Sequence, residues 1–276
     1  MSIRVTPLRH GSLQLDKDLL LSGHPGMILT RSHRDRPRVL CEAPIITYVI
    51  EHPEGRVLFD AAISTDWRQT WPEGYQEAAW YDDTDPEQYF ETTLKRCGLA
   101  PDDFRYVVLS HLHCDHAGNA RLFARANNVE VLAHENEIKG ALSLEEDQEF
   151  FLRGDYDVPG LKLVGVYGDR QILPGIHLME VPGHTWGTMA LVVEADAGPL
   201  ILTSDSCYTQ DSYGPPAIPS IISMDKERWA ASIEKIRRRA ERIGARVLFG
   251  HDTQCVAHRE GGPALEPVRF GPGAGY

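Results

Sequence analysis

The chain has 276 residues, of which 42% are hydrophobic and 25% are charged, a composition typical of a soluble globular protein with a sizeable core. It has no apolar run of about 18 residues and no basic-then-apolar start, so we expect neither a membrane-spanning helix nor a secretory signal. The net charge of −12 argues against nucleic acid as the main partner, because an acidic surface repels phosphates. Five scattered cysteines disfavour a disulfide framework and favour the cytoplasm.

The first half of the chain is predicted to contain strands and one helix. Residues 46–62 are typical of two strands joined by a turn. Residues 67–90 are rich in aromatic side chains, which we interpret either as an apolar pocket wall or as core and dimer contacts. Residues 85–98 are typical of one helix, which begins after Asp85 as N-cap and ends before Gly98.

The second half is predicted to alternate short strands with helices. A buried strand is expected over 105–111, followed by a turn and a short helix from about residue 117. A long helix is expected over 225–245, because its apolar side chains share one face. Further strands are predicted at 129–134, 161–166, 175–181, 188–195, 199–205 and 246–252. The pattern predicts a single α/β domain over 1–276, with two sheets packed face to face, helices outside and a loose tail from about residue 260.

The stretch SHLHCDHAGN, residues 110–119, concentrates side chains that bind metals. Residues i and i+2 of an extended strand point to the same side, so His111 and His113 can direct two imidazoles at one ion. Asp115 and His116 follow where the strand ends, and the turn can direct them at a second ion. Imidazole suits zinc, and carboxylate suits zinc, iron or manganese. A metal site is therefore favoured over a loop that merely carries surface histidines.

Three more polar side chains come directly after apolar runs. They are His184 in VPGHTWG, Asp205 in ILTSDSCY and His251 in VLFGHD. Any one of them alone would be interpreted as an ordinary loop residue. Together with the motif at 110–119, they indicate that several strand ends meet at one site.

In this order the motifs resemble those of the metallo-β-lactamase superfamily, from the strand that ends at Asp60 to the histidine of GHD. The resemblance implies an αββα sandwich of two mixed β-sheets with two divalent metal ions at one edge. Zinc is the default, and iron, cobalt or manganese would suit the same ligands. The family pattern implies a first metal bound by His111, His113 and His184, a second bound by Asp115, His116 and His251, and Asp205 bridging both. Asp60 matches an aspartate that orients a ligand instead of binding metal.

Tyr208 points to one branch of this superfamily. Its place three residues after Asp205 resembles the D-x-x-Y-T stretch of N-acyl homoserine lactone lactonases and of 4-pyridoxolactonase. In that branch the tyrosine hydroxyl reaches the substrate carbonyl, whereas the alternative is a core tyrosine. Two positions differ from the branch. Many members have a bulkier apolar residue in place of Cys114, and several have a histidine in place of Thr188. Both differences leave the identity of the substrate undecided. Cys114 and Cys207 are interpreted as small buried residues beside ligands.

The resemblance implies an enzyme that opens the lactone ring of an acyl homoserine lactone, a quorum signal, or of a related lactone, through a hydroxide bridging the metals. Tyr208 would stabilise the oxyanion and Asp115 would relay a proton to the leaving alkoxide. Two interpretations stay open for the aromatic residues at 67–90 together with Phe150 and Phe151: they line an apolar pocket wall, or most of them form core or dimer contacts. A glyoxalase-II-like thioesterase, another ester or phosphodiester hydrolase and an inactive scaffold stay open. We expect a small-molecule partner, neither nucleic acid nor membrane, and leave a homodimer open.

Overall fold

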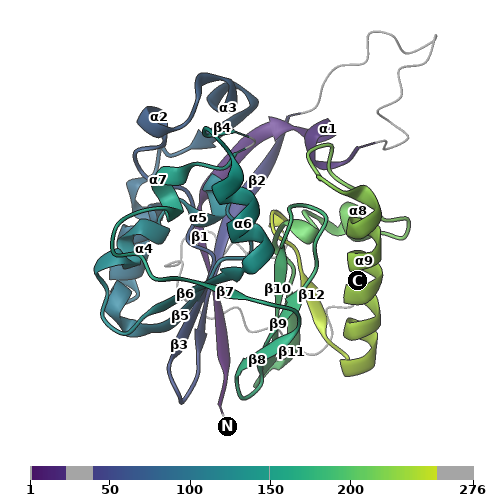
Figure 1. Ribbon diagram of the computed structural model, residues 1–276. Coiled ribbons are helices and arrows are strands. Elements are labelled where there is room, and N and C mark those ends of the chain that lie inside the picture. Colours follow the sequence, from purple (N-terminus) through teal and green to yellow (C-terminus); the bar gives the residue numbers. More distant parts are fainter. Residues whose placement is uncertain (1, 23–39, 149, 254–276) are drawn as a thin grey trace, which may run out of the picture.

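The computed structural model describes residues 2–22, 40–148 and 150–253, and it consists of two β-sheets packed face to face between outer helices (Figure 1). The predicted sandwich is therefore confirmed. The tail predicted from about residue 260 lies outside the described residues.

The larger sheet has seven strands in the order β4-β1-β2-β3-β5-β6-β7. The sheet is mixed. From β4 to β3 in this order, neighbouring strands are antiparallel, and from β3 to β7 they are parallel. Its strands are β1 (Arg4–Asp16), β2 (Leu40–Glu51), β3 (Arg56–Phe59), β4 (Ala79–Asp82), β5 (Phe104–Val108), β6 (Glu130–His134) and β7 (Leu163–Val166).

The smaller sheet has five strands in the order β12-β11-β10-β9-β8. Only the pair of β11 and β12 is parallel. Its strands are β8 (Arg170–Leu173), β9 (Ile176–Glu180), β10 (Met189–Ala195), β11 (Gly198–Leu202) and β12 (Arg246–Leu248).

Helices cover the outer face of each sheet (Figure 1). On the side of the smaller sheet lie α8 (Gln210–Tyr213) and α9 (Lys226–Ile243). The other helices are α1 (Lys17–Leu20), α2 (Trp67–Thr70), α3 (Glu73–Ala78), α4 (Phe90–Arg96), α5 (Cys114–Ala117), α6 (Glu135–Ser143) and α7 (Arg153–Tyr156). The Asp225 side chain caps α9, and Gly244 ends it in the left-handed conformation that glycine adopts without strain.

The apolar core has two layers. One fills the space between the sheets, where Phe59 and Val108 of the larger sheet and Leu191 of the smaller are fully buried, and it continues beneath α9 through Trp229 and Ile233. The other lies between the larger sheet and its helices. Because both faces of each central strand are covered, these strands are apolar throughout, as their sequences predict.

The structure corrects two of the predicted helix bounds. Residues 85–98 do not form one helix: a 3₁₀ turn covers Pro86–Gln88, and α4 begins only at Phe90, after an extended Tyr89. A tertiary contact explains the break, because the Gln88 side chain turns to accept the N–H of Gly11 at 3.0 Å. The short helix after the histidine motif begins at its cysteine, earlier than the predicted residue 117.

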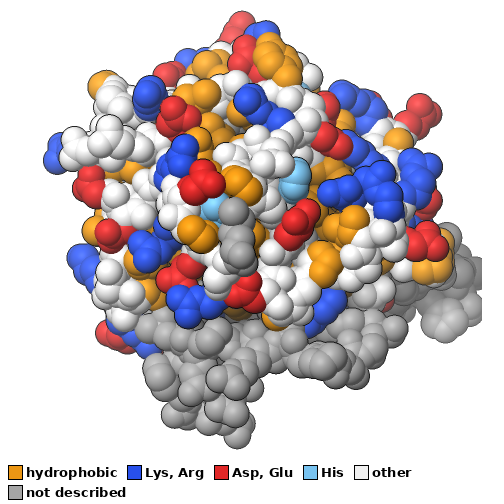
Figure 2. Space-filling model, turned by 90° about the horizontal axis from the view of Figure 1, so that it is seen from below, with side chains coloured by type: hydrophobic (Ala, Val, Ile, Leu, Met, Phe, Trp, Pro, Cys, Tyr) orange, Lys and Arg blue, Asp and Glu red, His pale blue; other side chains and the backbone are white. Residues whose placement is uncertain are grey.

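Charged side chains of both signs are intermixed on the face in Figure 2, and hydrophobic ones lie scattered among them. Among the described residues, no helix has both the length and the apolar character needed to cross a membrane.

Candidate metal centre

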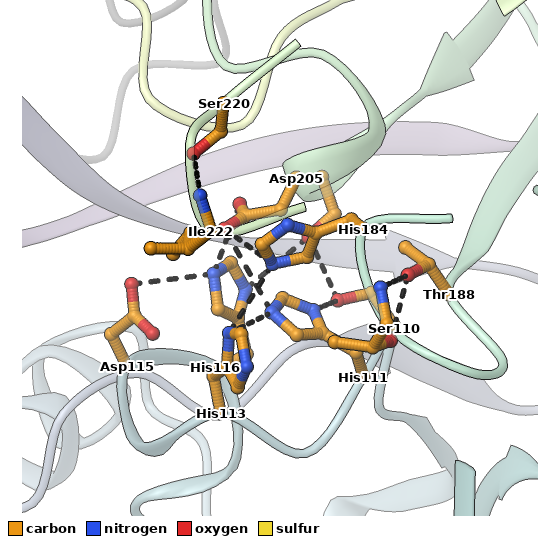
Figure 3. A network of polar contacts seen from close by, with 12 residues as sticks. Ser110, His111, His113, Asp115, His116, His184, Thr188, Asp205, Ser220 and Ile222 are labelled. Carbon is orange, nitrogen blue, oxygen red and sulfur yellow. Dashed lines mark hydrogen bonds and ion pairs between the residues drawn. The ribbon is translucent and has the colours of Figure 1, made fainter. Parts of the chain in front are cut away.

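The histidine motif lies on a loop that follows β5. The strand predicted over 105–111 ends at Val108, before the motif. The N–H of Leu109 still donates to the carbonyl oxygen of Leu132 on β6 at 2.8 Å, but the next N–H bonds to a side chain. The N–H of Ser110 donates to Oδ1 of Asp60 at 2.7 Å. His111 and His113 therefore lie beyond the strand, yet their imidazoles still point to a common centre (Figure 3).

Three imidazoles and one carboxylate form a first group of convergent side chains. Nδ1 of His113 lies 3.1 Å from Nε2 of His111 and 3.2 Å from Nε2 of His184. Oδ2 of Asp205 lies 3.4 Å from Nε2 of His184 and 3.8 Å from that of His111. All four ligand atoms lie within 4.8 Å of one another and all four residues are buried.

A second group shares Asp205 with the first. Oδ1 of Asp205 lies 3.1 Å from Nε2 of His116 and 3.0 Å from Nε2 of His251. Oδ2 of Asp115 lies 3.4 and 3.5 Å from the same two nitrogens. Each oxygen of Asp205 therefore faces a different group, which is the geometry of a carboxylate between two cations.

The atoms of both groups fit metal ions better than hydrogen bonds. His116 Nε2 and Asp205 Oδ1 are buried and lack a hydrogen-bond partner among the described residues, although they lie close together. Three imidazole nitrogens that converge within about 3.2 Å cannot all be paired by donating to one another. A cation accepts every one of these lone pairs, and nitrogen with carboxylate oxygen suits zinc and its neighbours in the first transition row.

Several contacts fix the rings of the second group from behind. Nδ1 of His116 lies 3.0 Å from Oδ2 of Asp60, and Nδ1 of His251 lies 3.0 Å from the carbonyl oxygen of Pro44. Each contact places the proton on Nδ1 and leaves Nε2 free as a ligand. The expected role of Asp60 agrees with this geometry, and its φ of 65° is a left-handed conformation that costs energy in a non-glycine residue.

The imidazoles of the first group are neutral in the metal-free protein. Burial, together with the neighbouring imidazoles, lowers the pKa of His113 to about 3. Burial likewise lowers the pKa of His184 to about 4 and holds that of His111 well below its usual range. Neutral imidazole is the form that binds metal, so these ligands need no deprotonation at neutral pH.

Charge is concentrated in the second group. Burial alone would raise the pKa of Asp205, but His116 and His251 hold that pKa well below its usual range. Burial would lower the pKa of His116, but the carboxylates of Asp115, Asp205 and Asp60 raise it well above its usual range. The anionic side chains thus attract positive charge, which a proton supplies in the metal-free protein and a cation would supply better.

A cavity opens beside both groups. Its lining includes Asp115, His113, Asp205 and His251, together with Tyr208, whose ring stacks on that of His251 with centroids 5.4 Å apart. Burial and the carboxylates of Asp205 and Asp115 raise the pKa of Tyr208 well above its usual range, so its hydroxyl is a proton donor.

The rest of the cavity lining is mainly apolar. It includes Leu13, Leu15, Leu19, Leu20, Ala43, Ala79, Ile222, Trp71 and Phe150. The aromatic residues at 67–90 divide between the two interpretations: Trp71 lines the cavity, Trp67 and Tyr81 are buried in the core, and Trp80 is 57% exposed. Phe151 lies in the core against His113, with ring centroids 4.6 Å apart.

Both cysteines beside the groups are buried, as expected. Burial raises the pKa of Cys207, and it raises that of Cys114 well above the usual range, so both thiols are neutral. Cys114 nevertheless lines the cavity. Residues that the sequence did not reveal are Ser110, Ser204 and Glu137, because hydroxyls and buried acceptors of backbone N–H groups follow no recognisable spacing. Ser204 contacts Asp60 at 3.2 Å, and Glu137 bonds to two of the loops around the first group.

Residues 44–251 match the sequence model of a protein family, the metallo-beta-lactamase superfamily. An N-acyl homoserine lactonase, AiiB of Agrobacterium fabrum, is 30% identical over 267 residues, which cover 90% of this chain and 92% of that protein. An N-acyl homoserine lactonase from a Bacillus species is 30% identical over 226 residues, covering 79% of this chain and 85% of that protein.

Solved structures share the fold. That of an N-acyl homoserine lactone hydrolase with the product N-hexanoyl-L-homoserine bound at its catalytic metal centre has a TM-score of 0.78 and 24% identity, covering 92% of this chain and 95% of that one. AidC, a dizinc quorum-quenching lactonase, has a TM-score of 0.68 and 15% identity, covering 91% and 87%.

Proposed function

The chain belongs to the metallo-β-lactamase superfamily, in its N-acyl homoserine lactonase-like branch, and from that premise we propose that it is a dinuclear metallohydrolase that opens lactone rings. The observation that carries the proposal is the cavity beside the two groups, whose lining combines a phenol and two carboxylates with mainly apolar side chains. Lactonases among its relatives support the substrate class.

In this proposal His111, His113 and His184 hold one ion, Asp115, His116 and His251 hold the other, and Asp205 lies between them. Zinc is the ion we propose. When bound, two divalent cations supply the Lewis acidity that makes water nucleophilic near neutral pH and polarises an ester carbonyl.

Tyr208 stabilises the oxyanion in the proposed reaction. Its phenol keeps its proton at neutral pH and lines the cavity next to Asp205, so it donates a hydrogen bond to the substrate carbonyl oxygen as negative charge develops there. The ring stack on His251 holds this hydroxyl in place without using its proton.

Asp115 moves the proton. Burial would raise its pKa, but His116 and His251 lower it, so the side chain is a carboxylate at neutral pH. It is also part of the cavity wall, with 13% of its side chain exposed. Asp115 accepts the proton from the attacking water and passes it to the ring oxygen as that oxygen leaves, which yields a hydroxy acid.

The composition of the wall favours a lactone with an apolar substituent over the alternative substrates. Among the described residues that line the cavity, none is a lysine or an arginine. A glutathione thioester brings carboxylates and a phosphodiester brings a phosphate, and both are usually bound by such cations. An acyl chain instead gains from aliphatic contact, at about 25 cal/mol for each Å² removed from water.

A hydrolysis assay with a pH indicator tests the proposal. Zinc-loaded protein would be offered short- and long-chain acyl homoserine lactones, an unsubstituted γ-lactone, a glutathione thioester and a phosphodiester. We expect turnover of the acyl lactones that stops on chelation and returns with zinc. Turnover of the thioester or the phosphodiester, with none of any lactone, would overturn the proposed substrate class.

A further inference from the structure

Glu137 is a fully buried acidic residue on α6, outside both groups of convergent side chains. A carboxyl group in such a place is costly unless it is fully hydrogen-bonded. Its two oxygens have different partners. Oε1 accepts the N–H of Leu112 at 3.0 Å, and Oε2 accepts the N–H of Gly187 at 2.9 Å.

The two donors belong to the two loops that carry the first group. Leu112 stands between His111 and His113, and Gly187 follows His184 by three residues. The backbones of these two segments are also joined by one hydrogen bond, which the N–H of Met189 donates to the carbonyl oxygen of Ser110 at 2.8 Å. Glu137 adds a second connection through one rigid carboxyl plane, so both loops are fixed relative to α6 and to each other.

The close approach of the second loop to α6 depends on a missing side chain. A Cβ atom on Gly187 would lie 2.8 Å from the backbone nitrogen of Glu137 and 2.8 Å from Cβ of His134. Such contacts are too short for real atoms, so only glycine lets the loop N–H reach the carboxyl group. The hydrogen bond between this loop and α6 therefore depends both on the buried Glu137 carboxyl group, which accepts it, and on the absence of a side chain at Gly187.

We propose that Glu137 is a positioning residue for the first metal, which holds His111 and His113 on one loop and His184 on the other at the spacing that a single cation requires. This inference rests on the proposed metal centre. It also identifies what fixes this group, since Nδ1 of His184 lacks a hydrogen-bond partner among the described residues.

The second metal depends on other contacts. Its histidines are fixed by Asp60 and by the carbonyl oxygen of Pro44. The N–H that Glu137 accepts from the histidine motif is that of Leu112, which lies between the two ligands of the first group and before the helix α5 that carries His116. Loss of Glu137 therefore weakens one site and spares the other. A residue that merely stabilised the core would weaken both sites equally or neither.

The test is zinc affinity, measured by competition with a chromophoric chelator. In Glu137→Gln one carboxyl oxygen becomes an NH₂ group, which cannot accept a backbone N–H. We expect the affinity of one of the two zinc ions to fall about ten- to a hundredfold, the range seen when partners of metal ligands are removed, and the other to change less than about threefold. In a His251→Ala background, which impairs the second group, Glu137→Gln should weaken the remaining site by the same factor.

Two further variants keep the result interpretable. Gly187→Ala forces the loop away from α6 without removing the buried carboxyl group, and we expect the same selective loss even if Glu137→Gln folds poorly. Asp155→Asn is the matched control, because Asp155 is also a buried acidic residue and its Oδ2 lacks a hydrogen-bond partner among the described residues. It should leave both zinc affinities unchanged.

Unchanged affinities in both Glu137→Gln and Gly187→Ala, or equal losses at the two sites, would overturn the positioning role while leaving the proposed function intact. A wild-type protein that binds no zinc would overturn the proposed function and this inference together.

Discussion

Oδ2 of Asp60 lies 3.0 Å from Nδ1 of His116, and on the other side of the ring Nε2 of His116 lies 3.1 Å from Oδ1 of Asp205. The imidazole thus connects a carboxylate at the end of β3 to the carboxylate shared by the two groups. Such a chain fixes the tautomer and orientation of a metal ligand and increases its basicity.

Asp60→Asn should weaken the zinc site that contains His116 about ten- to a hundredfold. Asparagine tolerates the left-handed backbone at this position, so the change removes charge and one acceptor without adding strain. Chelator competition measures the effect. Asp66→Asn is the control and should change neither site, because Asp66 lies six residues after Asp60 and forms a half-buried ion pair with Arg121. An unaltered second site in Asp60→Asn would contradict the role of Asp60.

Tyr208→Phe should retain two zinc ions and lose lactone turnover about ten- to a thousandfold, the range for an oxyanion donor. The ring stack on His251 survives the change, so the loss reports on the hydroxyl alone. Metal analysis and steady-state kinetics on the same preparation separate the two effects. Full activity in this variant would show that the hydroxyl plays no part in the reaction.

Leu19→Gln should shift the substrate preference toward short acyl chains. Leu19 lies on α1, is half-buried and lines the cavity. Its hydrogen bonds with Ser220 and Ile221 are accepted by its backbone carbonyl oxygen, so a change of side chain does not remove them. Each methylene that loses apolar contact costs about 0.8 kcal/mol, so kcat/KM for a ten-carbon acyl lactone should fall on the order of tenfold. The unsubstituted γ-lactone serves as control. Equal losses for all chain lengths would place the acyl chain elsewhere.

His10 predicts an acid-sensitive contribution to stability. Its ring is fully buried between Thr47 and the carbonyl oxygen of Gln88, and burial lowers its pKa from 6.5 to about 4. In the unfolded chain His10 therefore binds a proton below about pH 6.5, whereas in the folded chain it binds one only below about pH 4. Stability falls as pH falls through this window, by roughly 2–3 kcal/mol for this one group.

Urea unfolding of wild type and His10→Asn at several pH values measures this contribution. Other histidines titrate in both proteins, so the difference between the two curves isolates His10. We expect the advantage of wild type to shrink as the pH falls from 6.5 to 4. A difference that stays constant over this range would contradict the prediction.

The fold and the convergence of the seven predicted ligand side chains could be predicted because both follow from local patterns. Apolar runs that end in His or Asp identify strand ends, and strand ends of a sandwich meet at an edge. His184, Asp205 and His251 are far apart in the chain, yet each follows such a run. Their roles as ligands stay predictions until metal binding is measured.

Other features depend on tertiary contacts that no local pattern records. Glu137 looks like an ordinary helix residue in the sequence, and only the structure places its carboxyl group between two loops. The break before Phe90 has the same origin, because the contact of Gln88 with Gly11 overrides a good helical sequence. The strand β1 has few β-branched residues and gave no strong signal, although it forms part of the cavity wall.

Titrating metal-free protein with zinc while following hydrolysis of an acyl homoserine lactone measures whether the chain is a two-metal lactonase. We expect activity to be absent without metal and to reach its plateau at about two zinc ions per chain, because Asp205 presents one oxygen to each group. A plateau at one zinc ion, or no lactone turnover at any zinc concentration, would contradict this expectation.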